Sequence, residues 1–176
     1  MHQDGPTWVF GYGSLIWRQD FPYRRARRAI IEGWVRRFWQ GSHDHRGTPE
    51  SPGRVVTLVE APTARCVGRA FLVEPEVFAH LDHREKNGYQ RLAQTIHFSD
   101  GKEAGVVYLA PVGNHAFLGD APISEIASQI CSARGPSGSN FDYLMQLADS
   151  LRALKAEDTH VFELERKARE LHDAPS

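Results

Sequence analysis

The feature that most constrains the fold is a change of residue pattern near Pro122. Before it, short runs rich in β-branched and aromatic residues are separated by turn residues, which is typical of strands. After it, the pattern predicts helices over Ile123–Ala133, Asn140–Leu154 and Asp158–His172. Strands without βαβ alternation, followed by helices, indicate the α+β class. We therefore expect a small curved sheet or barrel with helices packed on its outside.

Six runs are predicted to be strands: Thr7–Gly11, Ala29–Gln40, Arg54–Glu60, Val67–Val73, Gln90–Phe98 and Glu103–Leu109. Gly33 interrupts the second run and predicts a bend or bulge. Asp100-Gly101 between the last two runs is a strong hairpin signal. One helix interrupts the strands, because Pro75 suits a helix start and apolar residues follow at Val77, Phe78 and Leu81.

The composition is that of an ordinary globular protein, and 176 residues fit one domain over residues 1–176. The formal net charge of -1 gives no general attraction to nucleic acid or to anionic membranes. Cys66 and Cys131 lie in apolar stretches and are expected to be buried thiols in a reducing compartment. No signal peptide or membrane-spanning run is visible, so we expect a cytoplasmic protein with no membrane partner.

The segment WVFGYGSLIW, residues 8–17, breaks an apolar run with glycines. Gly11-Tyr12-Gly13 begins like a dinucleotide fingerprint, but Ile16 stands where the third glycine is needed. No phosphate-binding P-loop follows, and the surroundings of Ser14 do not form a nucleophile elbow. Two explanations stay open: a turn that joins two elements, or a nest of backbone N–H groups that holds an anion such as a carboxylate.

Three further clusters have simple explanations. His43-Asp44-His45 lacks a third metal ligand in any known spacing, so a solvated loop is favoured over a metal site. The arginine clusters at 24–28 and 36–37 are expected to be solvated rather than to bind nucleic acid. Gly135–Ser139 precedes a helix and is best explained as a capping loop between helices.

Glu85 is the most interesting carboxylate. It falls at the end of the helix in the strand-rich half, next to a glycine turn and Tyr89. A carboxylate there can lean over a pocket with a raised pKa suited to proton transfer. A surface glutamate is the alternative, and the residues alone do not distinguish Glu85 from its competitors Glu74, Glu76 and Asp82.

Five segments in order, WVFGYGSLIW, RRFWQGSHDHRG, PGRVVTLVE, LDHREKNGY and GPSGSN, closely resemble the ChaC-like γ-glutamylcyclotransferases of the glutathione-specific class. The resemblance runs from Trp8 into the C-terminal helices. It implies a small mixed β-barrel flanked by helices, with a helical C-terminal third. It also implies cleavage of glutathione into 5-oxoproline and cysteinylglycine, without a metal or cofactor.

The resemblance also assigns residues. It places the catalytic glutamate at Glu85, and Tyr89 and Tyr108 are weaker candidates that either line the pocket or belong to the core. The residues it assigns to the γ-glutamyl group are Val9, Phe10, Gly11, Tyr12, Gly13, Ser14 and Leu15. Departures are small: Asn87 stands where glycine is frequent, His43 where threonine is frequent, and the first seven residues are extra.

The implied reaction suits a chain without a recognisable nucleophile motif. The α-amine of the substrate attacks its own γ-amide carbonyl, so the enzyme need only hold the folded conformer and move one proton. Two rival functions stay open at this point. One is the same chemistry on another γ-glutamyl compound, and the other is a non-catalytic module that binds RNA or protein.

Overall fold

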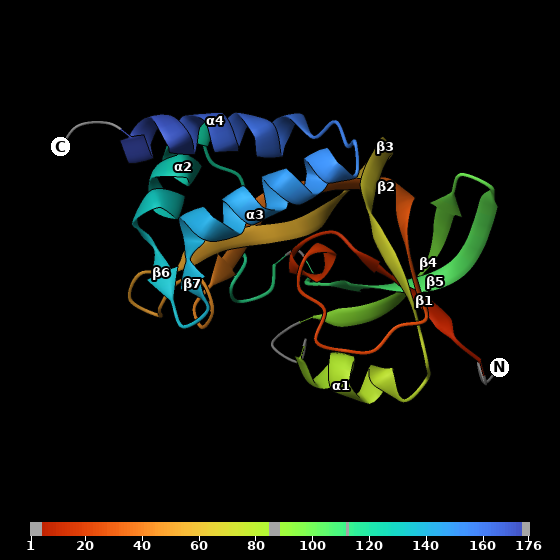
Figure 1. Ribbon diagram of the computed structural model, residues 1–176. Coiled ribbons are helices and arrows are strands. Elements are labelled where there is room, and N and C mark those ends of the chain that lie inside the picture. The colour runs from red at the N-terminus through yellow and green to blue at the C-terminus, as the bar shows by residue number, and fades with distance from the viewer. Residues whose placement is uncertain (1–4, 85–88, 112, 174–176) are drawn as a thin grey trace. The chain divides into compact units, whose positions relative to one another are not determined.

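The computed structural model describes residues 5–84, 89–111 and 113–173, and its elements are labelled in Figure 1. The chain divides into two compact units. The first unit comprises Met1–Val35 and Leu58–Asn114, and the second comprises Arg36–Thr57 and His115–Ser176. The strands β2 (Arg25–Ser42) and β3 (Gly53–Val73) contribute residues to both.

The strands of the sheet close into a barrel in the order β1-β3-β2-β4-β5. The remaining strands are β1 (Thr7–Gly11), β4 (Gln90–Phe98) and β5 (Gly101–Leu109). β1 pairs with β3 antiparallel and with β5 parallel, while β4 and β5 form an antiparallel hairpin. The predicted mixed barrel of the α+β class is therefore confirmed.

The hairpin between β4 and β5 follows the Asp-Gly signal. Phe98 pairs with Gly101, so the turn is Ser99-Asp100 and is tighter than the four residues expected. Gly101 has φ of 148°, and Gly33 within β2 has φ of 88°. Both values lie where glycine is favoured, which explains why glycine stands at these two positions.

One strand prediction is wrong. The segment Ala61–Cys66 was expected to separate two strands, but β3 is continuous from Gly53 to Val73. Residues 60–65 are exposed or half-buried, so they lack the apolar alternation that marks a strand. Pro62 is exposed, and proline is tolerated in a strand at positions that need no ladder N–H.

The helix α1 (Val77–Arg84) follows Pro75 as predicted. Its side chains Val77 and Leu81, four residues apart, share one face and are buried. They belong to the core of the first unit, which consists of Val9, Leu15, Phe21, Phe71, Val73, Val77, Leu81 and Tyr108. The packing of α1 on this core fixes the helix beside β1 and the residues that follow β1.

The second unit contains the three predicted helices, α2 (Ile123–Ser132), α3 (Asn140–Ala153) and α4 (Thr159–Asp173). The helices pack against one another, and Figure 1 shows α3 and α4 side by side at the blue end of the chain. Leu164 is fully buried, whereas Leu171, one heptad later, is largely exposed. The apolar stripe of α4 therefore ends before its last turn.

The segment Gly135–Ser139 is more ordered than the predicted loop. Arg134–Gly135 (β6) and Gly138–Ser139 (β7) pair as a small hairpin. A Cβ at Gly135 would lie 2.4 Å from the His45 carbonyl oxygen, so close backbone approach requires glycine there. The capping function is confirmed, because the Ser139 hydroxyl accepts the Asp142 N–H at 3.1 Å at the start of α3.

Candidate functional site

The glycine-rich loop leaves β1 at Gly11 and turns at once into a short 3₁₀ helix, Ser14–Ile16. The Ile16 N–H donates to the Gly13 carbonyl at 2.9 Å. A Cβ on Gly11 would lie 2.9 Å from the Leu15 Cβ, so glycine at this position lets the chain fold back closely. The first N–H groups of a helix have no acceptor within it, which leaves the backbone at Ser14 and Leu15 suited to an anion.

The side chains of the loop are part of the protein interior. Tyr12 and Leu15 are buried, whereas Trp17 is half-buried. The Tyr12 hydroxyl donates to the Tyr108 carbonyl oxygen at 2.6 Å, which joins the loop to β5. Tyr12 is therefore an aromatic residue of the core, and its hydroxyl is hydrogen-bonded to β5.

Val9 and Phe10 precede the loop on β1, and both are buried. Their backbones pair on one side with β3 and on the other with β5. Successive side chains of a strand face opposite sides, and Val9 faces the core that contains α1. The two residues therefore hold the position from which the loop leaves the strand.

Tyr108 lies at the centre of a polar network. Its hydroxyl donates to Asp82 Oδ1 of α1 at 2.5 Å. The Arg91 guanidinium on β4 lies 3.3 Å from Asp82 Oδ2 and 4.7 Å from the centre of the Phe78 ring. Burial, and secondly the bond to Asp82, raise the pKa of Tyr108, so its hydroxyl stays protonated and remains a donor at neutral pH.

The hairpin register explains why Arg91 and Tyr108 reach the same carboxylate. Arg91 pairs directly with Tyr108 across β4 and β5. Side chains at paired positions lie on the same face of a sheet. Asp82 was expected only as a competitor of Glu85, and neither Arg91 nor the use of Tyr108 as a donor to α1 was predicted.

The remaining site candidates lie in the chain next to the ends of α1 and the start of β4. Glu85, the predicted catalytic residue, lies outside the described residues, directly after the last residue of α1. Tyr89 precedes β4 and is half-buried. Glu74 forms an ion pair with Arg24, and Glu76 is exposed.

The other clusters do not gather into a site. Among the residues that the structure describes, no three histidine, cysteine, aspartate or glutamate side chains are grouped to hold a metal ion. The His45 imidazole lies 3.2 Å from the Ser137 hydroxyl on the surface. Cys66 and Cys131 are not joined in a disulfide among the described residues, and Cys131 is half-buried rather than fully buried.

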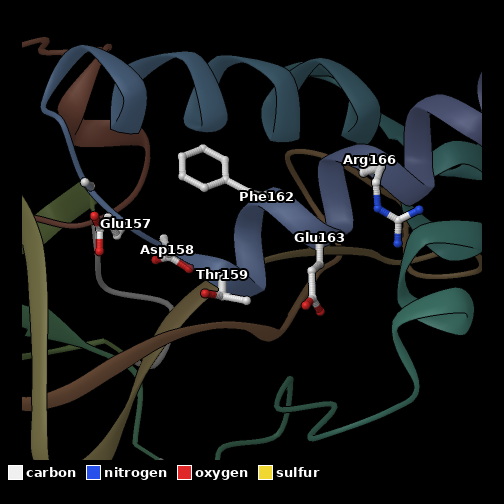
Figure 2. Close-up of a pocket in the computed structure, with 7 residues that line it drawn as sticks. Glu157, Asp158, Thr159, Phe162, Glu163 and Arg166 are labelled. Atoms are coloured by element: carbon white, nitrogen blue, oxygen red, sulfur yellow. The ribbon is translucent and has the colours of Figure 1, made fainter.

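Figure 2 shows an open hollow of about 480 Å³ in the second unit, next to the start of α4. Its labelled side chains carry both charges, and one of them, Asp158, already pairs with Arg36. No residue predicted for catalysis or substrate binding lines it. In the described parts of the chain, no helix has the length and apolar character needed to cross a membrane.

The comparisons with known proteins agree along most of the chain. The family model described as ChaC-like protein matches residues 7–171. Gamma-glutamylcyclotransferase 2-3 of Arabidopsis thaliana is 43% identical over 93% of this chain and 89% of its own. Human glutathione-specific gamma-glutamylcyclotransferase 1 is 40% identical over 88% of this chain and 74% of its own.

The structural comparison gives the same result. The crystal structure of a yeast γ-glutamylcyclotransferase specific to glutathione matches with a TM-score of 0.87. The two sequences are 28% identical, and the match covers 96% of this chain and 98% of the yeast chain. Sequence and fold lead to one conclusion: this chain belongs to the ChaC-like family.

Proposed function

We propose that this protein is a γ-glutamylcyclotransferase that cleaves glutathione into 5-oxoproline and cysteinylglycine. The loop Tyr12–Leu15 carries the proposal, because it combines a backbone turn suited to an anion with a hydroxyl bond that holds it to β5. Relatives that match most of this chain are named for this activity.

The reaction needs no nucleophile from the protein. The α-amine nitrogen of the γ-glutamyl group attacks the γ-amide carbonyl carbon, and a new C–N bond closes a five-membered lactam. The amide bond to cysteine breaks, and the proton lost by the amine passes to the leaving nitrogen. Holding the substrate folded contributes an effective molarity of about 10⁵–10⁸ M for well-oriented intramolecular reactions.

In this proposal the loop binds the α-carboxylate of the γ-glutamyl group. The N–H groups near Ser14 and Leu15 donate to it, and Gly11 allows the chain to fold back closely on Leu15. Val9 and Phe10 support the loop from β1. Tyr89 lies close in sequence to Glu85 and remains a candidate for the pocket wall.

Glu85 is the proposed acid–base residue. It takes the proton from the attacking amine and gives it to the leaving nitrogen, a contribution of about 10²–10⁴-fold in rate. Support comes from its competitors: Asp82 binds Tyr108 and Arg91, and Glu74 pairs with Arg24. These contacts occupy both carboxylates with other partners.

Mass spectrometry of glutathione incubated with the protein tests both parts of the proposal. We expect the wild type to release 5-oxoproline and cysteinylglycine, and Glu85→Gln to lose about 10²–10⁴-fold in kcat. The matched control is Glu76→Gln, which removes an exposed carboxylate from the same region and is expected to keep full activity.

Each outcome has one meaning. If folded wild-type protein leaves glutathione intact, the substrate assignment is wrong, and a panel of other γ-glutamyl compounds tests the same chemistry. If no γ-glutamyl compound is cleaved but RNA binds in a salt-sensitive way, the protein is a binding module. If Glu85→Gln is as active as the Glu76→Gln control, another group moves the proton.

We also propose that the protein acts in the cytoplasm without nucleic acid as a partner. Neither cysteine forms a disulfide among the described residues, which is typical of a reducing compartment. The formal net charge of -1 gives no general attraction to a polyanion.

A further inference from the structure

The network around Asp82 connects three elements of the first unit. Asp82 lies on α1, Arg91 on β4 and Tyr108 on β5. Tyr108 and Arg91 engage different oxygens of the Asp82 carboxylate, at 2.5 Å and 3.3 Å. These two contacts attach the Asp82 side chain, and through it α1, to β4 and β5.

Tyr108 also fixes the glycine-rich loop. Its backbone carbonyl accepts the Tyr12 hydroxyl, while its own hydroxyl donates to Asp82. One residue of β5 is therefore bonded to the loop at one end and to α1 at the other. The packing is continuous, because Leu15, Leu81 and the Tyr108 ring belong to the same core.

Asp82 lies close in the chain to Glu85, the proposed acid–base residue. Asp82 is separated from Glu85 by two residues, and three residues of chain span at most about 11 Å. Fixing Asp82 therefore limits where the chain can carry the Glu85 carboxylate. The side chains of Asp82 and Arg91 are 47% and 41% exposed, so their ion pair contributes little to stability.

We propose that Tyr108 and Asp82 are positioning residues for the cyclisation. The bond from the Tyr108 hydroxyl to Asp82 fixes the end of α1 relative to the loop proposed to hold the γ-glutamyl group, and the chain continues from that end directly to Glu85. Neither residue exchanges a proton with the substrate. The inference rests on the proposed function, since it assigns Glu85 as the acid–base residue.

Tyr108→Phe tests the inference, because it removes the hydroxyl but keeps the buried ring and the carbonyl that accepts Tyr12. We expect kcat on glutathione to fall about tenfold, as for loss of one charge-assisted hydrogen bond, while KM changes less than about twofold. The matched control is Tyr143→Phe. It removes an equally buried hydroxyl, which accepts the Val56 N–H in the second unit, and is expected to leave kcat unchanged.

A double-mutant cycle separates positioning from general damage. Asp82→Ala should lower kcat, and adding Tyr108→Phe to it should cause no further loss, because the two residues act through one bond. Asp82→Asn keeps an oxygen acceptor for the Tyr108 hydroxyl, so it should recover kcat relative to Asp82→Ala. Three outcomes would each overturn the inference. They are a double variant whose loss in kcat is the product of the two single losses, equal effects of Tyr108→Phe and Tyr143→Phe on kcat, and an unchanged kcat in Tyr108→Phe.

Hydrogen exchange gives a second readout that needs no substrate. Backbone amides of α1 should exchange faster in Tyr108→Phe and not in Tyr143→Phe. If the wild type does not cleave glutathione, the proposed function fails, while faster exchange of α1 still supports the fixing of the helix. If α1 exchange is unchanged in Tyr108→Phe, the positioning inference fails even when the wild type is active.

Discussion

Two ion pairs, one in each compact unit, lie at different depths. In the second unit the side chain of Arg36 is 1% exposed, and its partner Asp158 is 14% exposed. In the first unit, Asp82 and Arg91 keep nearly half of their side-chain surface. Breaking a buried pair leaves an uncompensated charge, whereas a half-exposed pair is screened by water. The comparison indicates that the Arg36–Asp158 pair contributes to the stability of the fold, whereas the Asp82–Arg91 pair contributes little to it.

Other buried polar groups of the second unit also connect distant segments of the chain through hydrogen bonds. The fully buried Asn140 side chain accepts the Arg54 N–H at 2.7 Å and donates to the Arg54 carbonyl at 2.8 Å. The Arg54 guanidinium donates to the carbonyls of Phe38 and Gly119. These bonds join segments that are far apart in the chain, so their loss should reduce stability.

The largest expected effect on stability comes from Asp158→Ala. It removes the carboxylate that pairs with the buried Arg36 guanidinium, which costs about 3–5 kcal/mol of unfolding free energy. Urea denaturation measures this loss. The control is Glu170→Ala, which breaks the exposed pair with Arg166 and should change stability by less than about 0.5 kcal/mol. Equal losses in the two variants would contradict the comparison.

The buried imidazole of His160 should make stability depend on pH. Its Nε2 accepts the Phe38 N–H at 3.0 Å, and its ring stacks on Phe38. The pKa of His160 is lowered to about 4. Burial is the main cause, and Arg37 and Arg36 add to it, against the opposing effect of Asp158 and Asp120.

The direction in which stability changes with pH follows from proton uptake by the unfolded chain. Between about pH 4 and pH 6.5 the unfolded chain binds a proton at His160 that the folded protein does not, so stability decreases as pH falls. The expected loss is about 3 kcal/mol by pH 4, and none above the unfolded pKa of about 6.5. Urea titrations at several pH values measure it. His160→Gln keeps an acceptor for the Phe38 N–H and should remove most of the dependence of unfolding free energy on pH. If the variant keeps the same pH dependence, other groups are responsible for it.

The smallest of these effects is expected in the first unit, for Gly11→Ala. The added Cβ meets Leu15 at 2.9 Å and must displace the loop, at a cost of about 1–3 kcal/mol. We expect KM for glutathione to rise, because the displaced loop is the proposed carboxylate site. Gly5→Ala is the control, since a Cβ at Gly5 has no described atom within 4 Å. A stable Gly11→Ala variant with an unchanged KM would show that the loop does not bind the substrate.

Much of the architecture could be predicted because the signals are local. The Asp-Gly signal predicts a hairpin between the last two strands, and the structure has one there. Its turn lies one residue earlier, at Ser99-Asp100, and this sets the register that pairs Arg91 with Tyr108. The apolar spacing of α1 and the capping serine of α3 also act over a few residues. The glycine-rich loop was found by its sequence motif, and its short helix agrees with a chain that turns sharply after β1.

What could not be predicted depends on contacts between distant residues. Nothing near Asp82 in the chain identifies Tyr108 as its partner, because the bond forms only once β5 lies beside α1. Tyr108 was left open between core and pocket, and its ring is buried in the core while its hydroxyl faces Asp82. The continuity of β3 was missed since its middle is exposed and contains Pro62.

The parallel pairing of β1 with β5 has a consequence for synthesis of the chain. Trp8 pairs with Gly105 and Val9 with Val106, so β1 leaves the ribosome well before β5, the strand with which it pairs in parallel. Pairings between such distant residues form slowly, and an unpaired strand edge is prone to aggregate. The glycine-rich loop is also synthesised well before Tyr108, so it obtains its hydroxyl bond only after Tyr108 has emerged.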